Sequence, residues 1–174
     1  MQKKAQLLKF MLEDIRRVTL DGIKDLTAEQ LFQQPMDGEF PVGAYLMHLA
    51  EAEAGWYHTM TGTPLPDDLK KKIYYGNWYD VPKKDYNPPV SVIPVEEYLS
   101  AIADVRKYLI DYLDNTTDED LDTKVTWKRN GKDITRTKEW IIYHLIEHEA
   151  HTRGQMFLLI RKGLKGEKSY ISNY

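Results

Sequence analysis

The spacing of apolar residues in four long stretches is the feature of this chain that most limits its fold. The stretches cover residues 6–20, 42–60, 95–115 and 137–162, and apolar side chains recur in them every three or four positions. Because an α-helix has 3.6 residues per turn, this spacing gathers the apolar side chains on one side of each helix. Four such helices bury their apolar sides against one another, so the sequence predicts an all-α four-helix bundle.

The first and third stretches give the clearest predicted core faces. For the first helix the predicted face is Leu7, Leu8, Met11, Ile15 and Val18. For the third helix it is Val95, Leu99, Ile102, Val105, Leu109 and Leu113, with the helix ending near residues 115–117. Each set follows the period of a helix that is buried on one side.

Two connecting segments are also informative. Thr27-Ala-Glu-Gln30 has the form of a capping box, which predicts a short helical turn carrying Leu31 and Phe32. Between the second and third helices, residues 62–94 are rich in tyrosine and proline, and we expect a long loop without a helix. Two roles for this loop stay open: a lid over a functional site, or an aromatic cover over one end of the core.

A small β-hairpin is predicted just before the last helix. Residues suited to strands flank Asn130-Gly131, the dipeptide that favours a type I′ turn. We expect the last helix to end at Gly163, and we expect the mid-helix Gly154 to allow close helix approach. The length fits a single domain over residues 1–174, and no internal repeat stands out.

Composition excludes several classes of function. The 24 basic residues are spread among 27 acidic ones, with a net charge of −3, so nucleic-acid binding is not expected. There is no run of eighteen apolar residues and no signal-peptide pattern near the beginning of the sequence, which predicts a cytoplasmic protein without membrane spans. The lack of cysteine excludes disulfides, thiolate ligands and a cysteine nucleophile.

Three of the five histidines, His144, His148 and His151, lie within eight residues of the last predicted helix. At 100° per residue they fall within an arc of roughly 60°, so their rings share one face. Burying imidazoles without partners costs roughly 1–3 kcal/mol each, and a shared metal ion would supply the partner. His48, on the predicted second helix, could add a ligand from a facing helix. For His58 we expect only a surface or packing role.

The sequence resembles the DinB/YfiT-like family of metal-binding four-helix bundles. The resemblance rests on Gly43-Ala-Tyr-Leu-Met-His-Leu-Ala-Glu-Ala-Glu53, on His144-Leu-Ile-Glu-His-Glu-Ala-His-Thr-Arg-Gly-Gln155 and on the connector Leu26-Thr-Ala-Glu-Gln-Leu31. It covers nearly the whole chain and implies a DinB-like bundle that holds a divalent metal, with zinc or nickel expected.

The resemblance also implies a ligand set. His48 takes the first ligand position of the family and His148 takes the second. The third position, directly before Arg-Gly-Gln, holds Thr152 in place of the family's histidine. We expect His151 to replace it, and His144 is the alternative. Of the nearby carboxylates, Glu51, Glu147 and Glu149 are candidates to orient ligands, although at least two of them are expected to be solvated.

The function that the resemblance implies is that of a metal-dependent enzyme. The reaction would be transfer of a low-molecular-weight thiol such as bacillithiol to an electrophile, or hydrolysis, with a small molecule as substrate. The alternative is a stress-response protein that binds metal or a small molecule without turnover. The resemblance also makes a homodimer an expectation, and it assigns no catalytic side chain.

Overall fold

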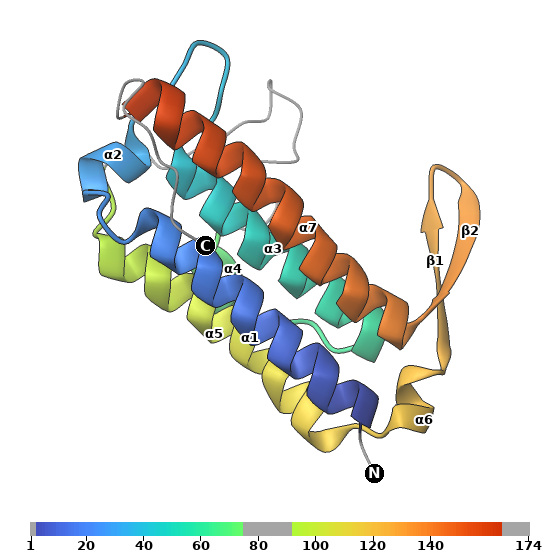
Figure 1. The fold of residues 1–174 in the computed structure, drawn as a ribbon. Coiled ribbons are helices and arrows are strands. Elements are labelled where there is room, and N and C mark those ends of the chain that lie inside the picture. Colours follow the sequence, from blue (N-terminus) through green and yellow to red (C-terminus); the bar gives the residue numbers. More distant parts are fainter. Residues whose placement is uncertain (1–2, 75–91, 165–174) are drawn as a thin grey trace.

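The computed structural model describes residues 3–74 and 92–164 of the chain (Figure 1). Four long helices form its body: α1 (Lys3–Ile23), α3 (Val42–Thr61), α5 (Val95–Asn115) and α7 (Lys138–Leu159). Three short helices connect them: α2 (Ala28–Phe32), α4 (Asp67–Lys72) and α6 (Asp118–Leu121). Strands β1 (Lys124–Arg129) and β2 (Lys132–Thr137) precede α7, and a π-helical turn, Ile160–Leu164, follows it.

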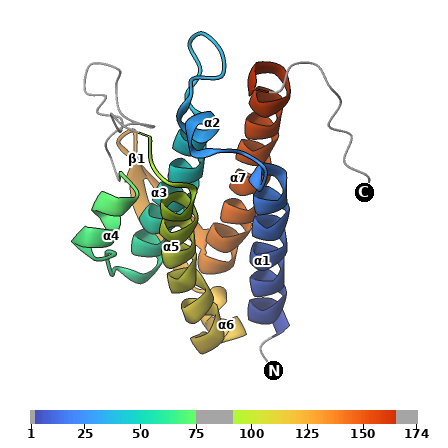
Figure 2. The ribbon, with the colours of Figure 1, turned by 90° about the vertical axis from the view of Figure 1, so that its left-hand side faces the viewer.

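The four long helices are packed so that α1 and α3 each lie against both α5 and α7 (Figures 1 and 2). Side-chain contacts give their relative directions. Lys9, early in α1, pairs with Asp114, late in α5, and Arg16, further along α1, meets Ile102, further back in α5. These two helices therefore run antiparallel. His48 meets His148 and Trp56 meets Trp140, so α3 and α7 also run antiparallel. The predicted four-helix bundle is confirmed, and no helix in the described parts of the chain is long and apolar enough to cross a membrane.

The predicted hairpin and capping box are both present. β1 and β2 pair antiparallel, with Trp127 opposite Ile134. Asn130 and Gly131 both have positive φ, 52° and 74°, as a type I′ turn requires. The Thr27 hydroxyl accepts from the backbone N–H of Gln30, whose side chain accepts from the backbone N–H of Thr27. The hairpin turn and the start of α2 are therefore determined by residues close together in the sequence.

The expectation of a loop without a helix over residues 62–94 is wrong in its first part, because α4 lies there. Pro66 precedes this helix, acidic Asp67 and Asp68 occupy its first turn, and lysines fill its last turn. This charge order suits the helix dipole. Leu69 and the following Ile73 are buried in the main core, which holds α4 against α5. The tyrosine- and proline-rich part, residues 75–91, lies outside the described residues.

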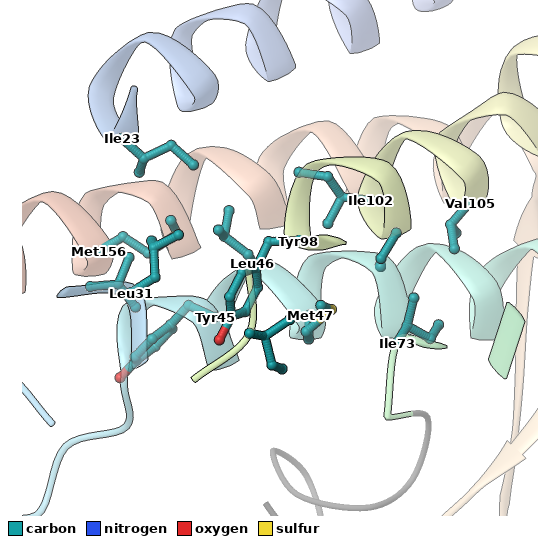
Figure 3. Packing of buried hydrophobic residues seen from close by; sticks show 14 of the residues in the cluster. Ile23, Leu31, Tyr45, Leu46, Met47, Ile73, Tyr98, Ile102, Val105 and Met156 are labelled. Carbon is teal, nitrogen blue, oxygen red and sulfur yellow. The ribbon is translucent and has the colours of Figure 1, made fainter. Parts of the chain in front are cut away.

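The core consists of two clusters of buried apolar residues, and Figure 3 shows the packing of the first cluster around Leu46, Tyr98 and Ile102. In α1 the buried face differs from the predicted one. Leu8 is buried, but Leu7 is 58% exposed and Met11 is also exposed. The buried face of α1 is instead Ala5, Leu8, Leu12, Arg16, Thr19 and Ile23. The apolar pattern pointed to the wrong phase because two of the inward positions carry polar side chains.

The two glycines of the last helix behave differently from expectation. Gly154 is exposed, and a Cβ added there would meet no atom within 4 Å, so no close helix approach explains it. Gly163 does not end the helix in a left-handed conformation, since it lies within the π-helical turn. A Cβ on Gly163 would come within 2.3 Å of the Pro35 carbonyl oxygen. The close approach is therefore at Gly163.

Candidate metal centre

The structure brings His48 of α3 and His148 of α7 together across the bundle. Their Nε2 atoms lie 3.1 Å apart, and their rings meet edge to face with centroids 4.9 Å apart. His48 is buried, with 8% of its surface exposed, and His148 is half-buried. Two nitrogens that share one zinc ion at about 2.0–2.1 Å lie about 3 Å apart, so this separation fits a shared cation as well as a direct hydrogen bond between the two Nε2 atoms.

The surroundings of His148 keep its ring neutral. Burial, together with the nearby rings of His48 and His144, lowers the pKa of His148 to about 4. At neutral pH the ring therefore retains a nitrogen lone pair, which is the form that binds a metal. Nδ1 of His48 lies 3.7 Å from a carboxylate oxygen of Glu51, one turn along the same helix. The carboxylate therefore lies on the Nδ1 side of the ring, while Nε2 faces His148.

His144 is held by tryptophans. Its ring stacks on Trp140 with centroids 4.9 Å apart and an angle of 6° between the planes, and it meets the edge of Trp56 at 5.3 Å. Trp127 from the hairpin completes this aromatic cluster, 5.0 Å from Trp56. The ring centroids of His144 and His148 are 6.3 Å apart. His144 is thus near the histidine pair but is packed against the cluster.

His151 lies on the exposed side of α7. Its Nε2 is 3.5 Å from the side-chain nitrogen of Gln155, one turn further along. Thr152, at the position where the family carries a histidine, is buried. His58 is exposed near the end of α3, as expected for a surface residue.

The arrangement therefore supplies two converging imidazoles, and the third ligand is not in place. Within residues 3–74 and 92–164, no three histidine, aspartate or glutamate side chains converge on one point as a metal site requires. The two nitrogens and the low pKa of His148 fit a divalent cation. A cation held by this pair would need a further ligand, and His151 is exposed beside Gln155.

A buried network of charges lies beside this pair, and the sequence analysis missed most of it. Arg16 of α1 and Arg106 of α5 both contact Glu53 of α3 and Glu149 of α7. Nε of Arg16 donates to Glu149 at 2.9 Å, and Nε of Arg106 donates to Glu53 at 3.0 Å. Thr19 adds a hydroxyl hydrogen bond to Glu149. Each helix of the bundle contributes at least one charged group to this network.

Of the three candidate carboxylates, only Glu149 belongs to this network. Glu147 is exposed and Glu51 is half-buried. Glu149 is 1% exposed, and its carboxylate binds the two arginines. The prediction that at least two of the three are solvated is wrong, because only Glu147 is exposed. Arg16, which follows Leu8 and Leu12 at helical spacing, was the signal that a buried partner existed, because an unpaired buried charge is too costly.

A helical bundle with a histidine pair between antiparallel α3 and α7 is the class of protein that the fold and site define. The chain belongs to the DinB superfamily, whose sequence model matches residues 11–156. The resemblance stated from the sequence is thereby confirmed.

Two solved structures share the fold. A conserved protein from Enterococcus faecalis is 15% identical, with a TM-score of 0.71, and the match covers 94% of this chain and 98% of that one. A DinB-like protein from Bacillus cereus ATCC 10987 is 23% identical, with a TM-score of 0.58, covering 92% and 91% of the two chains. The comparison with curated proteins found no match.

Proposed function

We propose that this protein is a metal-dependent enzyme that transfers a low-molecular-weight thiol to an electrophile, or hydrolyses a small molecule. His48 and His148 would hold a divalent cation, zinc or nickel. His151 would be the third ligand and His144 the alternative. The observation that carries the proposal is the 3.1 Å separation between the Nε2 atoms of His48 and His148.

The bound cation would supply the acidity that converts a coordinated thiol or water into a nucleophile near neutral pH. The protein's own residues prepare for this. Burial keeps His148 neutral, and Glu51 lies on the Nδ1 side of His48, where a carboxylate strengthens the ring as a ligand. The chain has no cysteine, so a thiol nucleophile would have to come from the substrate.

The aromatic cluster of Trp56, Trp127 and Trp140 supports a small-molecule substrate. It lies next to His144 on the side of the hairpin and is half-buried, so part of it faces solvent close to the histidine pair. Arg136 of β2 lies over the ring of Trp140, with its guanidinium carbon 5.3 Å from the ring centroid. These groups would form one wall of the substrate site, with apolar rings and a cation in reach.

The proposal is tested with the metal-loaded protein, a small thiol such as bacillithiol and a panel of electrophiles. Consumption of thiol and electrophile together is followed over time, and hydrolysis of ester and amide substrates is followed separately. We expect turnover by the parent protein and its loss in His48→Ala, with His58→Ala as the matched control on the same helix. Equal rates for the parent and His48→Ala would reject the catalytic proposal.

A second candidate is a protein that binds metal or a small molecule in a stress response without turnover. One observation favours it: the described residues bring together two imidazoles, and no third ligand is in place. This candidate predicts stoichiometric binding of metal that depends on His48, with no consumption of thiol. A cytoplasmic location and a homodimer stay predictions under both candidates.

A further inference from the structure

A short sequence pattern occurs twice, once in α3 and once in α7. His48-Leu-Ala-Glu-Ala-Glu-Ala54 matches His144-Leu-Ile-Glu-His-Glu-Ala150 at the histidine, the leucine, both glutamates and the last alanine. The matched residues also behave alike. Nδ1 of the histidine lies close to the glutamate three residues on, at 3.7 Å in α3 and 3.5 Å in α7.

The second glutamate of each pattern belongs to the buried charge network, and the network has the same twofold form. Each arginine donates to the backbone carbonyl one turn before the other arginine: Arg16 to Ile102, and Arg106 to Leu12. Each also donates through Nε to the glutamate of the other half, Arg16 to Glu149 and Arg106 to Glu53. The contacts of α1 with α7 are thus repeated by α5 with α3.

The short helices repeat as well. Thr27-Ala-Glu-Gln-Leu31 in the first half corresponds to Thr117-Asp-Glu-Asp-Leu121 in the second. In both, the threonine hydroxyl caps the helix by accepting the backbone N–H three residues on, and the leucine is fully buried. Figure 1 shows α2 and α6 at opposite ends of the bundle, as a twofold axis across the bundle would place them.

One constant interval relates Leu12 to Ile102, Arg16 to Arg106 and Thr27 to Thr117. A second, slightly longer interval relates the patterns in α3 and α7, because the β-hairpin is inserted before α7. These equivalences run against the expectation that the sequence has no internal repeat. The buried polar contacts of Arg16 and Arg106 add the positions in α1 and α5 that the short pattern does not cover.

We propose that the bundle is an internal duplication of a unit of two long helices, and that His144 marks a latent second histidine site opposite Ala52. The equivalence pairs His48 with His144 and Ala52 with His148. The contact between His48 and His148 then has a counterpart between His144 and Ala52. The first site has two histidines, whereas the second has one histidine and an alanine.

The pairing of α3 with α7 supports this placement independently. His48 faces His148, and Trp56 meets Trp140 two turns further along α3 and two turns back along α7. Halfway between these two contacts, antiparallel helices bring Ala52 opposite His144. Ala52 is half-buried and packs against the same core cluster as Trp56 and Trp140, so a longer side chain there would lie near His144.

The equivalence also decides whether His144 belongs to the first site. As the counterpart of His48, His144 lies across the twofold axis from the pair and is held by Trp140 and Trp56. We therefore infer that it is not the third ligand of the His48 site. This refinement rests on the proposed metal binding, whereas the duplication does not depend on it.

The test is to complete the second pair. Ala52→His is titrated with Ni²⁺ by equilibrium dialysis, and bound metal is measured by elemental analysis. The matched control is Thr59→His, which adds a histidine on the same face of α3 two turns on, opposite no histidine. We expect Ala52→His to bind about one equivalent of Ni²⁺ more than the parent, and Thr59→His to bind no more than the parent. Adding His144→Ala to Ala52→His should abolish the added equivalent.

The outcomes separate the two proposals. If the parent binds one equivalent and Ala52→His binds no more, the duplicated site is overturned while the first metal site stands. If the parent binds none but Ala52→His binds one that His144→Ala removes, the first metal site fails and the duplication stands. If neither protein binds Ni²⁺, both proposals fail.

A second variant is used if Ala52→His fails to fold. Should Ala52→His not melt cooperatively, Ala52→Asp is used in its place, because aspartate is smaller and offers a carboxylate oxygen as ligand. Its added Ni²⁺ must again depend on His144. A folded Ala52→Asp that gains no metal over a metal-binding parent would overturn the second site.

Discussion

The guanidinium of Arg16 and the carboxylate of Glu149 form a buried ion pair, with 2.9 Å from Nε to Oε1, that joins α1 to α7. Arg106 makes the equivalent pair with Glu53 between α5 and α3. Every long helix is therefore attached to the network at the level where the histidine pair is held. The position of His48 and His148 therefore depends on a network of buried charges.

Arg106→Met should destabilise the protein strongly. The substitution leaves Glu53 and Glu149 short of a cation while both stay buried, and removing one partner of a buried pair costs about 3–5 kcal/mol. Urea unfolding followed by circular dichroism measures the change in the free energy of unfolding. Lys107→Met, next in the chain but paired with Asp111 at the surface, should leave the urea midpoint unchanged. Equal effects of the two substitutions would contradict the role of the network.

Stability should fall in acid partly because of Asp120. Hydrogen bonds from Lys138 and Tyr112, with a smaller one from Thr116, lower the pKa of Asp120 to about 2 from its usual 3.8. The folded state therefore holds this proton more weakly than the unfolded chain does. The stabilisation is present above pH 3.8 and is lost as the pH falls toward 2. Because the side chain is partly exposed, the effect is expected to be under about 1 kcal/mol.

Asp120→Asn isolates this contribution. Thermal melting of the parent and of Asp120→Asn is compared at several pH values between 2 and 6. The difference in Tm between them should be largest at pH 5–6 and should shrink toward pH 2. A constant difference across this range would show that the carboxylate charge does not act as described.

The two glycines of the last helix should respond to alanine with opposite signs. Gly154→Ala adds a methyl group in open space and removes backbone freedom from the unfolded chain, so it should stabilise by about 0.5–1 kcal/mol. Gly163→Ala would force its Cβ against Pro35 and should destabilise by about 1–3 kcal/mol. Chemical unfolding measures the change in the free energy of unfolding of both variants. A stabilised Gly163→Ala would contradict the close approach of Gly163 to Pro35.

The sequence predicted the four long helices and the hairpin because apolar spacing and turn chemistry are local properties. It gave the wrong phase for α1, because Arg16 and Thr19 lie on the buried face and their partners come from distant helices. Residues 7 and 11 look like core positions by hydrophobicity alone, yet both are exposed. Buried polar contacts are tertiary, and spacing along one helix cannot reveal them.

The candidate site was likewise predicted only in part from the sequence. Its placement on facing helices followed from the positions of His48 and His148 in amphipathic segments. The different environments of His144 and His151 could not be predicted from the sequence, although both residues share a helix face with His148. His144 is held by Trp140 and Trp56, whereas His151 faces solvent beside Gln155. Those differences depend on which side chains the neighbouring helix and hairpin present.

The central claim is that His48 and His148 bind one divalent cation, and metal analysis of the untagged protein tests it most directly. Bound zinc and nickel are measured by elemental analysis for the parent and for His48→Ala, His148→Ala, His151→Ala and His144→Ala. We predict one equivalent per chain in the parent, loss of metal in the first three variants, and retention in His144→Ala. A parent protein that binds no metal under any loading condition would contradict the claim.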